Sequence, residues 1–94
     1  MITKTFDGIT PAIWEDIKQV FNTEAKPDNP IVDAQGDTNS HDIEFSWDYD
    51  GSSKLTTTII HVPWYIVKLG HNYDQCMEQF SAWVDKAKNN QLTA

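Results

Sequence analysis

The chain has 94 residues and a formal net charge of −7, and 39% of its residues are hydrophobic. This length suits one domain spanning residues 1–94, and the apolar content is sufficient for a hydrophobic core without disulfide cross-links. The chain contains no arginine, and its carboxylates outnumber its lysines two to one. We therefore expect direct binding neither to nucleic acid nor to an anionic membrane surface, because both depend on basic residues.

The negative charge lies mainly in residues 15–50, which hold ten of the fourteen carboxylates but only two of the seven lysines. The single cysteine, Cys76, has no partner for an internal disulfide, and the first residues lack the pattern of an export signal. No stretch of the sequence approaches the apolar length that spans a membrane. These features predict a cytoplasmic protein with an acidic surface.

Residues 1–6 are expected to form a short strand at the edge of a sheet. Thr10 is typical of a helix N-cap, and Pro11 is typical of the first helical position. Apolar residues then recur at intervals of three and four, which predicts a helix over residues 11–22. Two prolines and the absence of periodicity predict a loop over residues 23–40, functional or simply solvated, with Ile31 and Val32 held down or in a brief strand.

The sequence predicts a hairpin whose two strands span residues 41–49 and 53–62. In the first strand apolar and polar residues alternate, so that Ile43, Phe45 and Trp47 should face the core, and Asp42, Glu44, Ser46 and Asp48 should face solvent.

Two registers of this hairpin are possible. A three-residue loop of Tyr49, Asp50 and Gly51 with a G1 bulge places Leu55, Thr57 and Ile59 on the core face. A two-residue turn places Thr56, Thr58 and Ile60 there instead. The first register is preferred because it buries more apolar surface.

Residues 65–69, YIVKL, predict a third strand ended by Gly70. Residues 73–89 predict a helix, because apolar residues recur at helical spacing and Asn72 suits the N-cap. The resulting order, β-α-β-β-β-α, predicts an α+β two-layer sandwich. In this fold class an antiparallel sheet of three to four strands carries two helices on one face.

No catalytic, metal or cofactor site is predicted. Cys76 lies on the apolar stripe of the last helix, and burial there would keep its thiol inert. Residues Asp33, Gln35, Asp37 and Glu44 follow part of the EF-hand spacing, but the required central glycine is absent. The three histidines have no paired spacing for zinc. An enzyme is therefore less expected than a binding protein.

The leading hypothesis is a noncatalytic protein that binds the basic surface of a protein partner, as inhibitors, antitoxins, immunity proteins and phage antagonists do. An exposed Trp64 would be a candidate anchor, although core packing is its more common role. The predicted partner-binding residues are Asp33, Asp37, Asp42, Glu44, Asp48, Asp50 and Trp64. Two alternatives stay open. One is a small enzyme or ligand-binding domain with a pocket near residues 23–40, His41 and His61. The other is a homo-oligomeric structural subunit, such as a homodimer, that pairs through an edge strand.

Overall fold

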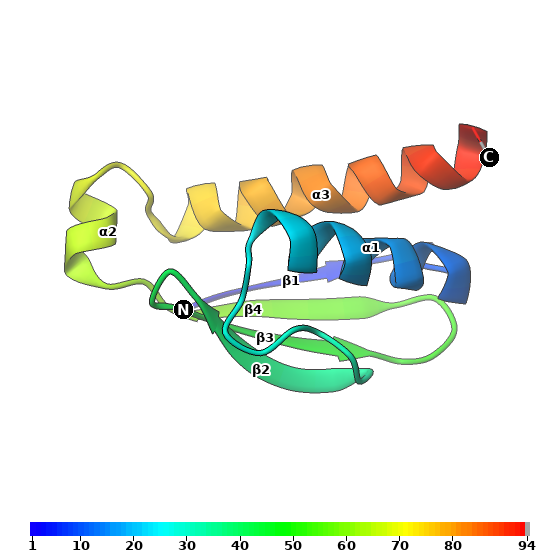
Figure 1. Ribbon diagram of the computed structural model, residues 1–94, viewed down its shortest axis with the longest axis horizontal. Helices are drawn as coiled ribbons and strands as arrows, with labels where there is room; N and C mark the ends of the chain where they lie inside the picture. The colour runs from blue at the N-terminus through cyan, green and yellow to red at the C-terminus, as the bar shows by residue number, and fades with distance from the viewer. Residues whose placement is uncertain (94) are drawn as a thin grey trace.

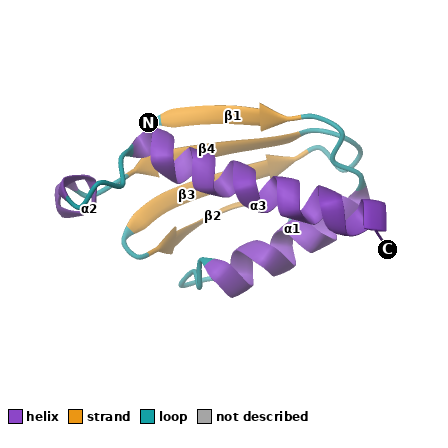
Figure 2. Ribbon diagram, turned by 90° about the horizontal axis from the view of Figure 1, so that it is seen from above, coloured by secondary structure: helices purple, strands orange, loops and turns teal. Residues whose placement is uncertain are grey.

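Four antiparallel strands form one open sheet, and two long helices cover one of its faces (Figures 1 and 2). The computed structural model describes the backbone of residues 1–93 and the side chains of residues 1–90. The strand order is β1-β4-β3-β2. The elements are β1 (Ile2–Phe6), α1 (Pro11–Glu24), β2 (Gln35–Ser40), β3 (Ile43–Tyr49), β4 (Leu55–His61), α2 (Trp64–Lys68) and α3 (Tyr73–Thr93). The predicted α+β class and the order β-α-β-β-β-α are confirmed.

The two long helices begin as the sequence predicts. The Thr10 side chain accepts a hydrogen bond from the backbone N–H of Ile13, and Pro11 is the first residue of α1. The Asn72 side chain accepts one from the N–H of Gln75 at the start of α3. Both helices extend a few residues beyond their predicted ends, to Glu24 and Thr93.

The predicted strand at residues 65–69 is wrong, because this segment forms α2. Strand β4 already pairs with β1 on one side and with β3 on the other, so residues just after β4 find no free neighbouring position in the sheet. Helical hydrogen bonds satisfy the backbone locally instead. The N–H groups of Ile66 and Val67 both donate to the Pro63 carbonyl, at 3.0 and 3.1 Å.

The missing strand, β2, lies within the predicted loop of residues 23–40. It pairs with β3 through a two-residue turn in which His41 and Asp42 have φ of 51° and 68°. Positive φ at both positions is the signature of a type I′ hairpin turn, for which Asn-Gly is the usual sequence. On the core face, Gly36 lies against the Trp47 ring, and a Cβ atom there would be 2.8 Å from it.

The preferred register of the β3–β4 hairpin is confirmed. Phe45 pairs with Ile59, Trp47 with Thr57 and Tyr49 with Leu55, and all six side chains are buried. The predicted three-residue loop is wrong, because Tyr49 belongs to β3 and the connection runs from Asp50 to Lys54.

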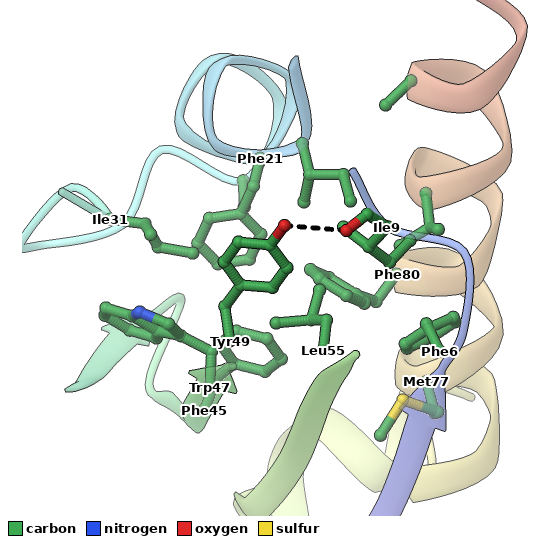
Figure 3. Packing of buried hydrophobic residues seen from close by; sticks show 14 of the residues in the cluster. Phe6, Ile9, Phe21, Ile31, Phe45, Trp47, Tyr49, Leu55, Met77 and Phe80 are labelled. Atoms are coloured by element: carbon green, nitrogen blue, oxygen red, sulfur yellow. Dashed lines mark hydrogen bonds between the residues drawn. The ribbon is translucent and has the colours of Figure 1, made fainter. Parts of the chain in front are cut away.

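Aromatic rings from three elements form the centre of the core. The Phe45 ring centroid is 4.9 Å from that of Phe80 and 5.1 Å from that of Phe21, so the sheet, α3 and α1 meet here (Figure 3). The polar tip of Tyr49 is satisfied, since its hydroxyl donates to the Ile9 carbonyl at 2.7 Å.

A β-bulge reverses the orientation of His61. Phe45 pairs with Ile59, whereas Glu44, which precedes Phe45 in β3, pairs with His61. Strand β4 therefore carries one extra residue, Ile60, between these two pairs. By strand alternation alone, His61 would lie on the inward side with Ile59. It is instead exposed beside Glu44, because the extra residue exchanges the two faces.

Candidate functional site

The face of the sheet opposite the helices is uncovered (Figure 1). We call it the outer face, and its side chains are mostly polar. Its strand residues are Thr3, Thr5, Gln35, Asp37, Asn39, Glu44, Ser46, Asp48, Thr56, Thr58, Ile60 and His61. No lysine belongs to this set, so the charge of the outer face comes from its carboxylates alone.

Three of the predicted carboxylates meet on the β2–β3 half of the outer face. Asp37 pairs with Ser46, which stands between Glu44 and Asp48 on β3. Asp37 is therefore a diagonal neighbour of both carboxylates, a relation that places Cα atoms roughly 7–8 Å apart. Beside them is a polar hollow of about 110 Å³ lined in part by Asn29, Asp37 and Glu44. We call Asp37, Glu44 and Asp48 the acidic face.

The other three predicted carboxylates lie elsewhere. Asp42 sits in the β2–β3 turn, where its carboxylate accepts a hydrogen bond from the Tyr65 hydroxyl of α2. Asp33 precedes β2, and its backbone carbonyl accepts a 2.8 Å hydrogen bond from the Trp47 indole N–H. Neither residue extends the acidic face.

Asp50 has a structural role in the loop between β3 and β4. Its Oδ1 atom accepts hydrogen bonds from the backbone N–H groups of Ser52, Ser53 and Lys54 at 2.8, 2.9 and 3.0 Å. These bonds, led by the one from Lys54, favour the ionised form and lower the pKa of Asp50 to about 2. This carboxylate is therefore committed to the loop.

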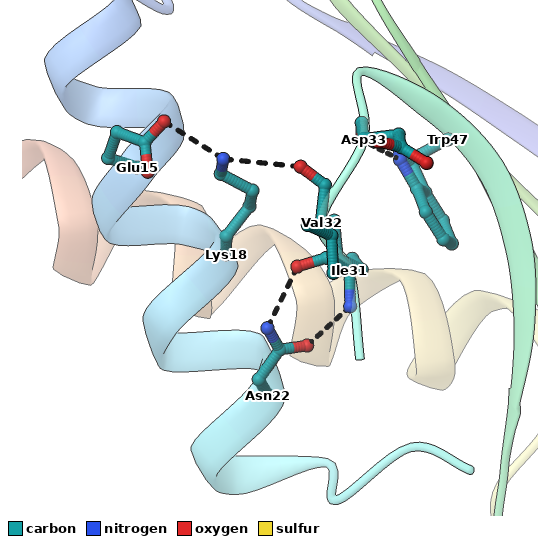
Figure 4. A network of polar contacts seen from close by, with 7 residues as sticks. All are labelled: Glu15, Lys18, Asn22, Ile31, Val32, Asp33 and Trp47. Carbon is teal, nitrogen blue, oxygen red and sulfur yellow. Dashed lines mark hydrogen bonds and ion pairs between the residues drawn. The ribbon is translucent and has the colours of Figure 1, made fainter. Parts of the chain in front are cut away.

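The segment between α1 and β2 is fixed by side chains that the sequence did not single out. The Asn22 amide accepts from the Ile31 N–H at 2.8 Å and donates to the Ile31 carbonyl at 3.0 Å (Figure 4). Lys18 contacts Glu15 at 2.9 Å and the Val32 carbonyl at 3.5 Å. The expectation that Ile31 and Val32 are held down is confirmed for Ile31, whose side chain is buried, whereas the Val32 side chain is 69% exposed.

Helix α2 projects from one end of the molecule (Figure 1). Its large apolar side chains are exposed to solvent. Trp64 and Leu69 are each 74% exposed, and Val67 and Tyr65 are 41% and 40% exposed. No residue of α2 is buried, and Ile66 packs only partly against the core. Trp64 thus lies outside the core and is free to contact another molecule.

A pocket of about 740 Å³ opens beside α2, which we call the α2 pocket. Its floor is apolar and includes Phe45, Phe80 and Ile59, whereas polar residues lie around it. The full lining is Phe21, Glu24, Ala25, Ser40, His41, Ile43, Phe45, Ile59, Ile66, Leu69, Gly70, His71, Gln75, Cys76, Gln79, Phe80 and Trp83. Its size lies in the range of about 300–1,000 Å³ that is typical of binding pockets.

The expected pairing of His41 and His61 in one pocket is wrong. His41 lines the α2 pocket, but the bulge in β4 places His61 beside Glu44 instead, and His71 is the second histidine of the lining. Cys76 also lines it and is half-buried, less enclosed than its sequence position suggested. Burial raises the pKa of the Cys76 thiol, which favours the protonated, unreactive form.

Within the described part of the chain, no three His, Cys, Asp or Glu side chains are grouped so that they could hold a metal ion. None of the described helices, α3 included, has the length and apolar character needed to cross a membrane. Comparison of the chain with protein-family models, with curated proteins and with solved structures returns no match.

Proposed function

We propose that this protein is a noncatalytic binding protein whose acidic face docks on the basic surface of a protein partner. The observation that carries the proposal is the position of Asp37, Glu44 and Asp48, which share an uncovered sheet face whose strand residues include no lysine. A surface of one sign attracts the opposite sign over several ångströms and raises the rate of encounter. A net charge of −7 adds to this attraction.

The hollow between Asp37 and Glu44 supports recognition of a basic side chain. Asn29 and Asn39, whose side chains each carry an acceptor oxygen, line the same hollow as the two carboxylates. An ammonium group donates three hydrogen bonds and accepts none, so it suits a site rich in oxygen acceptors. A lysine of the partner fits this chemistry.

The size of the outer face limits the strength of the complex. Strands lie about 4.8 Å apart and rise about 3.3 Å per residue, so four short strands present a face of about 400 Å². A typical stable complex buries roughly 800 Å² on each partner. The outer face alone therefore supports a weak complex that depends strongly on salt, and a tighter complex requires further contacts.

The proposed partners are proteins with a basic functional surface, such as a surface that otherwise binds nucleic acid. By covering such a surface, this protein would act as an inhibitor, antitoxin, immunity protein or antagonist. The proposal places the protein in the cytoplasm, where a single thiol without a disulfide partner is expected to stay reduced. No catalytic role is proposed, because the α2 pocket offers a thiol of raised pKa instead of an activated nucleophile.

The test uses an octalysine peptide as the basic probe and follows backbone amides by NMR. The peptide should shift amides of β2 and β3, and the variant Asp37→Asn/Glu44→Gln/Asp48→Asn should lose most of this response. A control variant, Asp74→Asn/Glu78→Gln/Asp85→Asn, removes the same charge from exposed residues of α3. Equal loss in both variants would mean that net charge, not the acidic face, attracts the peptide.

A further inference from the structure

We propose that two copies of this protein associate through α2, each inserting its exposed apolar side chains into the α2 pocket of the other. We call Trp64, Val67 and Leu69 the α2 knob, since they are 74%, 41% and 74% exposed on one projecting helix and the residue that follows it. This inference is independent of the acidic face, which lies on another surface.

The contacts of α2 within its own chain do not explain why so many of its side chains are large and apolar. Packing of Ile66 and the hydrogen bond from the Tyr65 hydroxyl to Asp42 hold the helix to the body. A helix of five residues has little stability of its own, because the first turn is costly to form. Large apolar side chains gathered on such a projection are typical of a surface that another molecule covers.

The α2 knob and the α2 pocket lie next to each other at the same end of the molecule. Leu69 belongs to both, since it follows α2 and also lines the pocket together with Ile66. A two-fold dimer uses the same patch on both copies, so the patch must contain both a projection and the hollow that receives it. An apolar projection adjoining an apolar-floored hollow meets this requirement.

The charge distribution favours a second copy as the occupant. Residues 61–73 contain no carboxylate, although the chain carries fourteen, and Lys68 is the lysine among them. The pocket lining contains one carboxylate, Glu24. Apart from Asp42, whose carboxylate is hydrogen-bonded to Tyr65, two copies that meet at this end avoid most of their mutual repulsion. The contact also brings Lys68 of one copy to the end of the other copy that contains Glu24.

The available area is consistent with a dimer. A stable interface buries roughly 800 Å² on each copy. An aromatic side chain buries about 150–250 Å², so Trp64, partly exposed Tyr65 and the aliphatic side chains of the α2 knob supply about half of that area. The lining of the pocket contributes the remainder.

The first experiment is sedimentation velocity on the full chain from micromolar to sub-millimolar concentration. The wild type should dimerise, and Leu69→Asp should weaken the dimer by at least about tenfold, which corresponds to ~1.4 kcal/mol. Val32→Asp is the matched control, because Val32 is 69% exposed on the segment before β2 and should leave the dimer unchanged. Trp64→Lys provides a second knob variant.

The second experiment separates knob-into-pocket association from simple apolar contact. Gln79→Trp adds bulk to the pocket lining at an exposed position of α3 and should also give a monomer. A mixture of Gln79→Trp and Trp64→Lys should recover heterodimer, because Trp64 does not line the pocket and one intact knob and one intact pocket therefore remain. Thermal melts verify that both variants are folded.

Three results would overturn the inference: a wild type that stays monomeric at the highest concentration, a dimer unaffected by Leu69→Asp, or a mixture that forms no heterodimer. A monomeric wild type whose α2 pocket binds an apolar fluorescent dye would instead identify a small-molecule site.

Discussion

The outer face of the sheet and the α2 end of the protein are both exposed to solvent, but they differ in charge, shape and attachment. The outer face is mostly polar, and its backbone is fixed by strand pairing among β1, β4, β3 and β2. The α2 end is apolar and hollowed, and Ile66 and one hydrogen bond from Tyr65 attach its helix to the body.

This difference shows two ways in which a small domain can present a binding surface. Charges on a rigid sheet act over distance and favour fast association, but salt screens them. Apolar side chains act only at contact, and their burial contributes affinity that salt does not screen. We therefore expect high salt to weaken binding at the acidic face while leaving association through α2 intact.

The largest effect is expected when an aromatic side chain of the core is compared with one of α2. Phe45→Ala should reduce the free energy of unfolding by about 3–5 kcal/mol, because the ring is 3% exposed and its loss leaves a cavity. Trp64→Ala should change it by less than about 0.5 kcal/mol. Urea titrations at low protein concentration measure both. Similar losses in the two variants would place Trp64 in the core.

Much of the fold could be predicted because its signals are local. The alternation from Ile43 to Tyr49 identifies a strand and the residues of its two faces. The caps at Thr10 and Asn72, with apolar residues at helical spacing, identify both long helices. These features depend on neighbouring residues, so no tertiary information is needed to read them.

The elements that were missed depend on the rest of the fold. Strand β2 has a polar sequence, QGDTNS, and exists because it pairs with β3. Residues 65–69 are apolar enough for a strand, but the sheet has no free place beside β4. The bulge that turns His61 outward has no sequence signal either, because it is defined by the pairing of β4 with β3.

The candidate surfaces were predictable to different degrees. Strand parity correctly placed Glu44 and Asp48 on the side away from the helices. Asp37 joins them only through the unpredicted strand β2, whereas the positions of Asp42 and Asp50 in turns depend on loop geometry. The α2 pocket could not be predicted, because residues from α1, β3, α2 and α3 line it together.

An intermediate loss of stability is expected for substitution of Asn22, which fixes the segment between α1 and β2 beside the sheet. Asn22→Ala leaves the backbone N–H and carbonyl of buried Ile31 without their partner, and should cost about 1–3 kcal/mol of unfolding free energy. Gln19→Ala, at an exposed position of the same helix, should cost little. Hydrogen exchange of the Ile31 amide gives a local measurement. Unchanged protection of that amide in Asn22→Ala would show that the segment is held by other contacts.

The smallest expected effect is a pH-dependent change in Tm. It distinguishes Asp50, which holds a loop, from the carboxylates of the acidic face. The pKa of Asp50 is lowered to about 2, so its ionised form stabilises the fold above its unfolded pKa of about 3.9, and this contribution is lost as the pH falls through 2. Asp50→Asn should therefore lower Tm at neutral pH, and the difference from wild type should shrink between about pH 4 and pH 2. The variant Asp37→Asn/Glu44→Gln/Asp48→Asn should instead keep or slightly raise Tm at neutral pH, because like charges on one face are removed. Thermal melts across this pH range distinguish the two behaviours, and a marked loss of Tm in the triple variant would mean that the acidic face is needed for the fold and is not free for a partner.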